Sequence, residues 1–513
     1  MIRKPLSPYQ RDIWVAAAQF PESNQYTLFC YDRLVGEVDE QALRHAMASV
    51  ARRTDAFGLR LGEEDGEPFQ WLAAELDVSI TTLDLTHEYD PDADIQAWLR
   101  NAFGFSYALD GNQLADLFLL RASDSTYVYV RAHHVVCDAW GLQYFMGQVR
   151  DEYLRLTANA VTETQTQATS FLAVIEADDY TQLEPYREDR AYFSQVLSGV
   201  EPALFSRKLA AGARSNAGYS ITLERPLLAT IRDRGESPFL FLSAAIALYL
   251  ARVHQRNEVV LGIPVLNRAD RRAKAVVGHF ANTLPLRVEI IPGQHIEEFV
   301  AQLRQGIRTL LRHQRVPLGD VAKGSAPLFD TTISYMRWPK AVSIPGVTCE
   351  TVAQTHAHDQ DALAIWVSEF DDHSDVQVDF EYACDVFDED FTMEAAAKHV
   401  AAIAAMVIFA LFGQIKAVAI VALVVIGLTG VSMNPALITR GARVGHNNML
   451  VNSVHTACIM LGVMAGSWIG GWGIAAGLGL QGALWVGAGL GVLALFSLLP
   501  ELRTRASQST FAR

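Results

Sequence analysis

The stretch RAHHVVCDAWG, residues 131–141, joins a strand-like segment to a helix-like one. His133 and His134 end an apolar, strand-like segment, and Asp138 follows at the start of a helix-like one. Neighbouring side chains of a strand point to opposite faces, so one histidine can face a cleft while the other packs inside. A carboxylate at a helix start is favoured by the free backbone N–H groups there. The cleft-facing histidine is therefore a candidate general base or positioning group.

A structural explanation fits the same residues. Two histidines at a strand end can simply be packed or solvated, and Asp138 can be an ordinary helix cap. A metal site is disfavoured, because adjacent histidines on opposite faces of a strand make a poor chelate. The five cysteines are scattered along the chain without a CxxC pair, at positions 30, 137, 349, 384 and 458. We expect no metal, and the spacing alone leaves catalysis and a structural role both open.

Residues 1–400 alternate between segments with helical and with strand periodicity. We expect helices over 6–19, 39–53, 138–156, 240–255 and 295–314, and strands over 27–35, 125–134 and 259–265. Ser7 and Pro8 provide an N-cap and a first helical residue for the earliest of these helices. The polar composition around 158–190 predicts a linker between two lobes.

The last hundred residues differ physically from the rest of the chain. The whole chain carries a net charge of −15. Residues 401–513 contain six basic residues and one acidic residue, so this tail carries +5 and residues 1–400 carry −20. The acidic part argues against nucleic-acid binding, which requires clustered Lys and Arg. Three nearly uncharged segments, 417–438, 449–472 and 482–499, are long enough to cross a bilayer.

A series of motifs in sequence order resembles the condensation domains of nonribosomal peptide synthetases. The segments that carry the resemblance are LSPYQRDIW (6–14), RRTDAFGLRL (52–61), HHVVCDAWG (133–141), SFLAVIEADD with EDRAYF (170–193), LGIPVLNR (261–268), VGHFANTLPLRV (277–288), HQRVPLGDV (313–321), PLFDTTISY (327–335) and YACDVFDED (382–390). In the second motif, Thr54 stands where a histidine is usual and Gly58 where an arginine is usual.

This resemblance implies an α/β (α+β) fold, a two-lobed pseudodimer similar to chloramphenicol acetyltransferase, followed by a small all-α transmembrane segment. It divides the chain into an N-terminal acyltransferase-like lobe (1–175) and a C-terminal one (176–400). Three to four transmembrane helices (401–500) and a polar tail (501–513) follow. A tunnel between the lobes would receive both substrates.

The resemblance also implies the roles of the motif residues. His134 would orient the acceptor amine, or accept its proton, with His133 in support. Asp138 would be structural and would form a bidentate pair with Arg268, which holds the histidine loop in shape.

Four further positions follow from the same motifs. Gly141 would be a structural partner of the His-His-Asp motif, and Trp140 and Asn282 would line the substrate tunnel. Ala139 departs from the family, which usually has glycine directly after the aspartate. A methyl group there either narrows the tunnel or is accommodated, and glycine allows backbone conformations that other residues resist.

The implied reaction is condensation, in which an acceptor amine attacks a carrier-bound acyl or aminoacyl thioester and an amide (or ester) forms. We expect no directly bound cofactor, because both substrates would ride on the phosphopantetheine arms of carrier proteins. We find no adenylation-type phosphate loop and no LGGxS-like stretch, so these partners would act in trans. The alternatives are a coenzyme A-dependent acyltransferase, an epimerisation domain, which shares HHxxxD, and an inactive carrier-docking remnant.

The segment from about 405 to 505 resembles the last helices of major facilitator superfamily efflux transporters. It is too short for transport, so we interpret it as a membrane anchor, the product of a gene fusion or an error in the assembled sequence. Arg440 and Arg443 follow the first predicted span, and the positive-inside rule places them in the cytoplasm. A fourth crossing at 396–413 would keep the enzyme part cytoplasmic. We therefore expect a membrane-associated protein with a cytoplasmic catalytic part.

Overall fold

The structure is a computed structural model. It describes residues 2–19, 24, 26–74, 79–157, 169–200, 204–205, 216–233, 235–321, 328–337, 344–354, 361–369, 375–384 and 386. All of them belong to the first of two compact units, Met1–Ile426. No helix within these ranges is long and apolar enough to cross a membrane. The predicted transmembrane segments between 396 and 499 lie outside the described residues.

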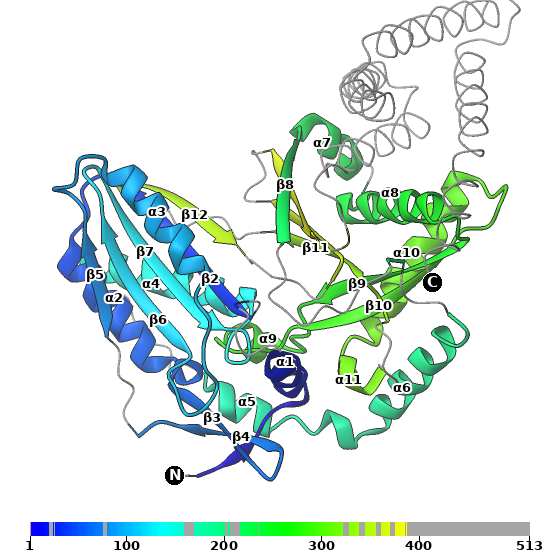
Figure 1. Cartoon of the computed structure of the whole chain (residues 1–513), viewed down its shortest axis with the longest axis horizontal. Coiled ribbons are helices and arrows are strands. Elements are labelled where there is room, and N and C mark those ends of the chain that lie inside the picture. Colours follow the sequence, from blue (N-terminus) through cyan, green and yellow to red (C-terminus); the bar gives the residue numbers. More distant parts are fainter. Residues whose placement is uncertain are drawn as a thin grey trace, which may run out of the picture. The chain divides into compact units, whose positions relative to one another are not determined.

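The first large sheet of the described part has five strands in the order β12-β2-β7-β6-β5. Its strands are β2 (Thr27–Val35), β5 (Ile80–Asp84), β6 (Ala115–Arg121), β7 (Ser125–His133) and β12 (Thr348–Gln354). Alternate side chains of β2 enter different cores, because successive residues of a strand face opposite sides. Leu28 and Cys30 pack against α2 (Glu40–Arg53) and α4 (Ala139–Thr157), whereas Phe29 and Tyr31 pack against α3 (Pro91–Phe103). Figure 1 shows these helices on the two sides of the sheet.

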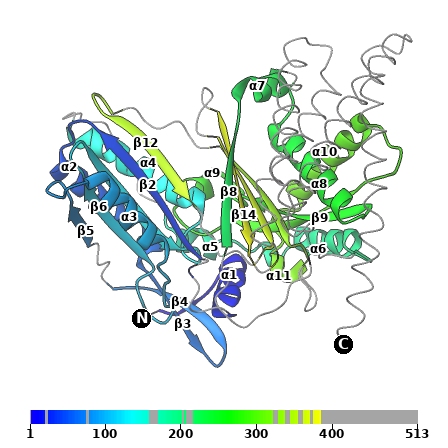
Figure 2. The same cartoon turned by 45° about the horizontal axis from the view of Figure 1, so that its top comes forward.

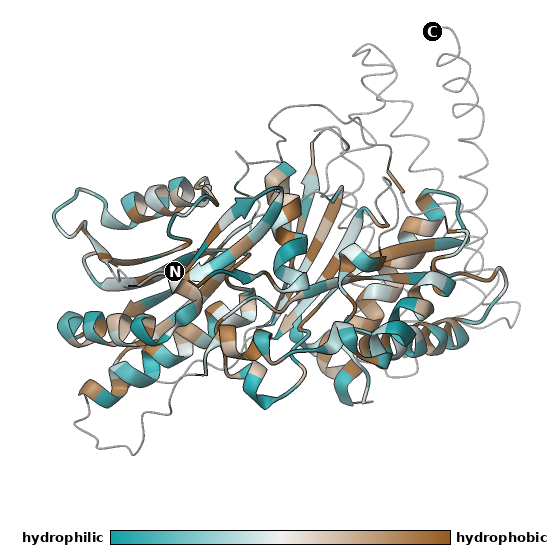
Figure 3. Ribbon diagram, turned by 90° about the horizontal axis from the view of Figure 1, so that it is seen from below, coloured by the Kyte–Doolittle hydropathy of each residue, from teal (hydrophilic) through white to brown (hydrophobic). Residues whose placement is uncertain are grey.

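The second large sheet has six strands in the described part, in the order β10-β9-β11-β13-β14-β8. Its strands are β8 (Asn216–Leu223), β9 (Glu258–Val265), β10 (Asn282–Glu289), β11 (Thr331–Arg337), β13 (Leu363–Glu369) and β14 (Val376–Ala383). One apolar core joins this sheet to α6 (Glu184–Val196), α7 (Arg225–Asp233), α8 (Pro238–Val253) and α10 (Ile296–Arg312). Hydrophobic and hydrophilic residues alternate along the helices in Figure 3, as expected for helices with one buried side.

Two segments connect these layers. Strand β12 comes late in the chain but pairs antiparallel with β2, so that Val352 lies opposite Tyr31. Figure 2 shows β12 running beside β2 at the edge of the first sheet. Helix α1 (Pro8–Gln19) lies between the two large sheets in Figures 1 and 2. A small sheet of β1 (Lys4–Pro5), β4 (Glu67–Leu72) and β3 (Leu59–Glu64) adjoins it.

The short elements of the described part complete the chain between these layers. They are η1 (Asp55–Gly58), α5 (Phe171–Glu176), η2 (Tyr180–Gln182), α9 (Arg271–Lys274) and α11 (Leu318–Val321). Helix α5 begins at an N-cap, Ser170, whose hydroxyl accepts a hydrogen bond from the backbone N–H of Ala173 at 3.1 Å.

The expected helices and strands are found close to their predicted bounds. Strand β2 covers 27–35 as predicted, and α1 begins at Pro8, with Ser7 Oγ accepting a hydrogen bond from the Gln10 backbone N–H at 3.2 Å. The segment 158–190, predicted as a linker between two lobes, contains helical residues, since 171–176 and 184–196 form helices. These helices are polar on their exposed sides, but each contributes a buried phenylalanine, Phe171 and Phe193. Residues 158–168 lie outside the described residues.

Candidate active site between the two sheets

His133 is the last residue of β7, and His134 lies in the turn that follows it. The strand ends at His133, and α4 begins at Ala139. The backbone N–H of His134 donates to the carbonyl of Tyr26 at 2.6 Å, which ties the turn to the segment before β2. Gln10 of α1 is fully buried, and its side-chain amide donates to the carbonyl of Val135 at 3.0 Å. The turn is therefore held from both sides.

His133 is an interior residue with a satisfied nitrogen. Its side chain is 4% exposed, and its Nδ1 accepts a hydrogen bond from the backbone N–H of Val135 at 3.1 Å. Burial lowers the pKa of His133 to about 3, and the neighbouring His134 acts in the same direction. His133 is consequently neutral at physiological pH and holds the turn rather than reaching the cavity.

His134 is half-buried and lines a cavity between the two sheets. Burial lowers its pKa, while the carboxylate of Asp138 and the backbone carbonyls of His134 and Cys137 act in the opposite direction. The imidazole is therefore neutral near pH 7 and has a lone pair available for a proton.

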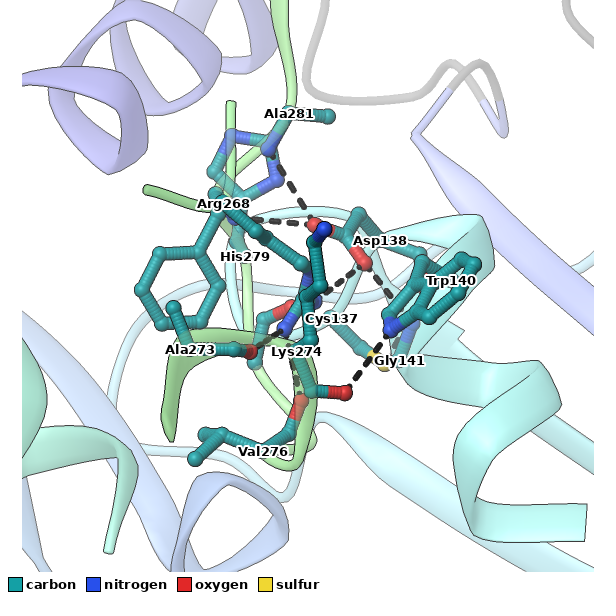
Figure 4. A network of polar contacts seen from close by, with 12 residues as sticks. Cys137, Asp138, Trp140, Gly141, Arg268, Ala273, Lys274, Val276, His279 and Ala281 are labelled. Carbon is teal, nitrogen blue, oxygen red and sulfur yellow. Dashed lines mark hydrogen bonds and ion pairs between the residues drawn. The ribbon is translucent and has the colours of Figure 1, made fainter. Parts of the chain in front are cut away.

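Asp138 is 1% exposed, and both of its carboxylate oxygens are occupied. Oδ1 accepts hydrogen bonds from the backbone N–H of Gly141 at 2.8 Å and from Arg268 Nη2 at 2.7 Å. Oδ2 accepts from the backbone N–H groups of Phe280 and Ala281 at 2.9 and 3.1 Å. Figure 4 shows Asp138 enclosed by these groups. Burial alone would raise the pKa of Asp138, but Arg268 and the hydrogen bonds outweigh it, and the net pKa is lowered.

Arg268 follows β9 and reaches Asp138 from the second sheet. Its Nη1 donates to the carbonyls of Ala273 and Val276, and its Nη2 also donates to the carbonyl of Gly278 at 3.0 Å. The expectation of a bidentate pair is wrong, because a single Nη2–Oδ1 contact joins the two side chains. Oδ2 of Asp138 accepts from backbone N–H groups instead, and Nη1 of Arg268 donates to backbone carbonyls. Arg268 thus fastens the loop between β9 and β10 as well as Asp138.

This loop, residues 266–281, belongs to the second sheet by sequence but packs into the core of the first. Ala273, Val276, Val277 and Phe280 are buried there beside residues of α4. The backbone N–H of Asp138 donates to the carbonyl of Gly278 at 3.2 Å. The start of α4 and the loop therefore form one unit around Asp138.

The other expected site residues lie beside this unit. Gly141 has no room for a side chain, since an added Cβ would lie 2.8 Å from Cys137 Sγ and 3.1 Å from the backbone N and O of Gly278. Trp140 lines the cavity and its Nε1 donates to the carbonyl of Lys274 at 3.0 Å. Asn282 also lines the cavity, and its amide donates to the carbonyls of Gln314 and Val316 at 3.1 and 2.6 Å.

The cavity has a volume of about 510 Å³ and is lined by both sheets and by α1. Tyr9, His134, Trp140, Pro264, Asn282 and Trp366 are among its lining residues. A volume of this size fits the range of pockets that enclose small molecules. Within the described residues, no three His, Cys, Asp or Glu side chains are grouped as metal ligands would be.

Two residues of the site were not singled out by the sequence. His279 lies in the segment VGHFANTLPLRV, and its Nδ1 lies 3.2 Å from Nδ1 of His134. Gln10 lies in LSPYQRDIW and supports the turn from α1. The signal available for His279 was a histidine between Gly278 and Phe280 in that motif. Nothing in the sequence distinguishes Gln10 from a surface glutamine.

Comparison with known proteins places this arrangement in context. The sequence profile of a family described as "Condensation domain" matches residues 3–421. Surfactin synthase subunit 1 of Bacillus subtilis (strain 168) is 26% identical over 404 residues, which are 75% of this chain and 11% of that protein. A dimodular nonribosomal peptide synthase of the same organism is 24% identical over 398 residues, covering 75% of this chain and 17% of that protein. The chain thus spans a small part of these curated relatives.

Solved structures show the same fold. A mutant of the starter condensation domain of rhizomide synthetase, crystallised in complex with C8-CoA, superposes with a TM-score of 0.70 at 24% identity. The match covers 79% of this chain and 95% of that structure.

Proposed function

Because this chain belongs to the condensation-domain family, we propose that it forms an amide (or ester) bond between a carrier-bound acyl or aminoacyl thioester and an acceptor amine. One observation carries the proposal: the buried Asp138–Arg268 contact holds His134 at the wall of a cavity that both sheets line. A neutral imidazole at that place suits a reaction in which an amine must lose a proton.

The proposed chemistry uses His134 alone as the proton-accepting group. The amine nitrogen forms a bond with the thioester carbonyl carbon, and the carbon–sulfur bond breaks. The proton lost by the amine passes to His134 and then to the leaving sulfur, so that the products are an amide and a thiol. Asp138 takes no part in this transfer, because its two oxygens already accept four hydrogen bonds from the chain.

The substrates in this proposal arrive on the phosphopantetheine arms of carrier proteins, which adenylation modules load. No cofactor is bound directly. The contacts of Trp140 and Asn282 with the cavity support their assignment as tunnel residues. Residues 1–175 and 176–400 remain the proposed lobes, with β12 as the segment that the second contributes to the sheet of the first.

The test is amide formation by the full chain, purified in detergent. Octanoyl-loaded carrier protein and leucyl-N-acetylcysteamine thioester serve as the first probes, within a panel of donors and acceptors, and the product is detected by mass spectrometry. We expect His134→Ala to lower the rate by about 10²–10⁴-fold, the usual contribution of a general base. His45→Ala, on the exposed side of α2, is the matched control and should keep the wild-type rate. Absence of product with every pair, or an unchanged rate in His134→Ala, contradicts the proposal.

A second candidate is acyl transfer from coenzyme A rather than from a carrier. It is favoured by the similar structure that was solved in complex with C8-CoA. The same assay separates the two, because the ratio of kcat/KM for octanoyl-CoA and octanoyl-loaded carrier reports which donor the protein prefers. A higher value for the carrier supports the condensation reaction.

We also propose that residues 401–500 anchor the protein in a membrane with the enzyme part in the cytoplasm. Three long uncharged segments and the transporter-like resemblance of the tail support this, together with arginines 440 and 443 between the first two segments. Protease treatment of inside-out vesicles should digest an N-terminal tag. Protection of the tag contradicts the cytoplasmic placement, and recovery of the full chain in the soluble fraction contradicts the anchor.

A further inference from the structure

A second buried histidine contacts His134 inside the proposed site. His279 lies in the loop between β9 and β10 and is 1% exposed. Its Nδ1 is 3.2 Å from Nδ1 of His134, and the two rings meet edge to face with centroids 4.9 Å apart. The two residues are 145 positions apart in sequence and come from different sheets.

A hydrogen bond between the two Nδ1 atoms needs one proton between them. Two lone pairs would repel each other, and two N–H groups would clash, so one ring donates and the other accepts. The backbone carbonyls of His134 and Cys137 also act on the His134 ring, and a carbonyl can only accept. Since Nδ1 of His134 is engaged, Nε2 is the nitrogen left for the substrate. If His134 is the donor, its Nε2 keeps a lone pair and can take a proton. If His279 is the donor, Nε2 of His134 carries the hydrogen and cannot act as a base.

We propose that His279 is a positioning residue that accepts a hydrogen bond from Nδ1–H of His134 and thereby makes Nε2 of His134 the base. This inference rests on the proposed function. In amide formation the amine proton is taken up at Nε2 of His134, the charge on that ring is stabilised by the lone pair of His279, and the proton then leaves with the sulfur. The histidine pair therefore holds one extra proton at a time.

The surroundings of His279 disfavour a positive charge on its ring. Its Nε2 is buried and has no hydrogen-bond partner among the described residues. Burial lowers the pKa of His279 to about 3, and His134 and Arg268 act in the same direction, while Asp138 and the backbone carbonyl of Tyr9 oppose them. A second proton on the pair is thus strongly disfavoured. His279 acts only through His134.

The charged and titratable groups around the pair are few. Asp138 and Arg268 form the ion pair behind the two rings, and Asp138 raises the pKa of both histidines. His133 and Cys137 are the buried neighbours on the turn itself. His279 also acts on the pKa of Asp138. The contact with His279 is therefore reported by the comparison of His279→Leu with His279→Asn, which both remove the imidazole and differ in the acceptor that they offer to Nδ1–H of His134.

The first experiment needs no substrate. Deuterium exchange at the imidazole C2 carbon, followed by mass spectrometry across pH, gives the pKa of each histidine in the full chain. His279→Leu removes the acceptor, and we expect the pKa of His134 to fall by about one pH unit, as for loss of a hydrogen bond to a charged group. His279→Asn keeps an acceptor oxygen near the Nδ1 position and should restore most of the value. A rise in the pKa of His134 in His279→Leu would assign the proton to His279 and overturn the proposal, as would an unchanged pKa.

The matched control is His254, which is also partly buried but packs against Phe205 at the end of α8, away from the cavity. His254→Leu should leave the pKa of His134 as in the wild-type chain. Melting temperatures of all variants show whether a change comes from loss of folding.

The second experiment measures amide formation with the octanoyl and leucyl probes. In His279→Leu we expect kcat to fall about tenfold or more, with little change in KM and an acidic limb of the pH profile moved to lower pH. His279→Asn should recover most of kcat. An unchanged kcat in His279→Leu would overturn the role in catalysis. If the wild-type chain makes no product at all, the proposed function fails, while the exchange experiment still decides whether the two rings share a proton in the proposed direction.

Discussion

At the scale of single residues, the start of α4 shows where glycine is required. Ala139 stands where the family usually has glycine, and it is not among the described non-glycine residues with positive φ. Its methyl group lines the cavity. Two residues later, a Cβ on Gly141 would contact Cys137 Sγ and the backbone of Gly278. The steric restriction therefore lies at 141, and the alanine at 139 is accommodated.

This difference predicts that substitutions at 139 and 141 change the free energy of unfolding by different amounts. Gly141→Ala should destabilise the protein by about 1–3 kcal/mol, because the loop at Gly278 must move to admit a methyl group. Ala139→Gly should cost no more than about 1 kcal/mol, the helix-propensity difference. Urea denaturation measures both. Equal stability of Gly141→Ala and the wild-type chain would contradict the close contact.

The buried neutral histidines predict acid sensitivity. His133 and His279 have pKa values lowered to about 3, whereas an unfolded histidine titrates near its ordinary value of 6.5. Between these values the unfolded chain binds more protons than the folded one, so stability falls as the pH is lowered from 6.5 towards 3. At pH 5.5 each histidine should cost about 1 kcal/mol of stability relative to pH 7.5.

The measurement is urea denaturation of the wild-type chain and of His133→Asn at both pH values. The asparagine keeps an acceptor for the Val135 N–H but cannot be protonated. We expect a smaller loss of stability between pH 7.5 and 5.5 in the variant. The same loss in both proteins would show that His133 is not held neutral in the folded state.

At the scale of elements, the loop between β9 and β10 follows a strand of the second sheet and packs into the core of the first. Its approach depends on Gly278, where an added Cβ would lie 2.1 Å from the ring of Phe171. Phe171 is the first residue of α5 and is fully buried. Asp55 binds the start of this helix, accepting hydrogen bonds from Ser170 Oγ at 2.6 Å and from the Phe171 N–H at 2.9 Å. The helix that the sequence presented as linker thus supports the loop that holds Asp138.

Gly278→Ala should therefore displace the loop from Phe171. We expect a loss of stability of about 2 kcal/mol or more, since the ring has no flexible end to move aside. We expect a large loss of amide formation too, because the carbonyl of Gly278 contacts both Asp138 and Arg268. Gly306→Ala in α10 is the matched control. Its Cβ would lie 3.5 Å from Leu286 Cδ1, and alanine favours helix, so stability should stay the same or rise. Similar behaviour of the two variants would contradict the tight packing at Gly278.

At the scale of the whole described part, the site forms only where the two sheets meet. Asp138 belongs to the first sheet and its helix, and Arg268 follows a strand of the second. Both are buried, so each would be a costly unpaired charge without the other. The pKa of Asp138 is lowered in the folded state. Its contribution to stability is therefore present above the ordinary pKa of an unfolded aspartate and is lost as the pH falls through the lower folded value.

Arg268→Met should cost about 3–5 kcal/mol of stability, because it leaves the carboxylate of Asp138 buried without its charge partner. Arg187→Met removes the exposed pair with Glu184 and should cost at most about 1 kcal/mol. Urea denaturation measures both, and amide formation reports whether the cavity is still assembled. A loss of stability in Arg268→Met as small as that in the control would show that the buried ion pair does not hold the two sheets together.

The local pattern of apolar residues was sufficient to predict many of the helices and strands. The period of apolar residues located β2, α2, α4, β9 and α10, because side chains repeat every two residues in a strand and every 3.6 in a helix. The motif spacing placed Asp138 at a helix start and Arg268 after a strand. The partnership of these two residues came from the family resemblance, since no local rule connects positions 130 residues apart.

The sequence by itself therefore determined the helices and strands, the family, and the position of His133 and His134 at the end of β7. Only the tertiary structure decided which groups surround the residues of the site. In place of the expected bidentate contact, Asp138 accepts from one arginine nitrogen and three backbone N–H groups. The tertiary structure also pairs β12 with β2 and places His279 beside His134. The physical reason is that these contacts join segments far apart in the chain. Their geometry depends on how two whole cores pack against each other. The periodicity of the sequence reports local structure, and it does not indicate which side chain from the other core a residue will contact.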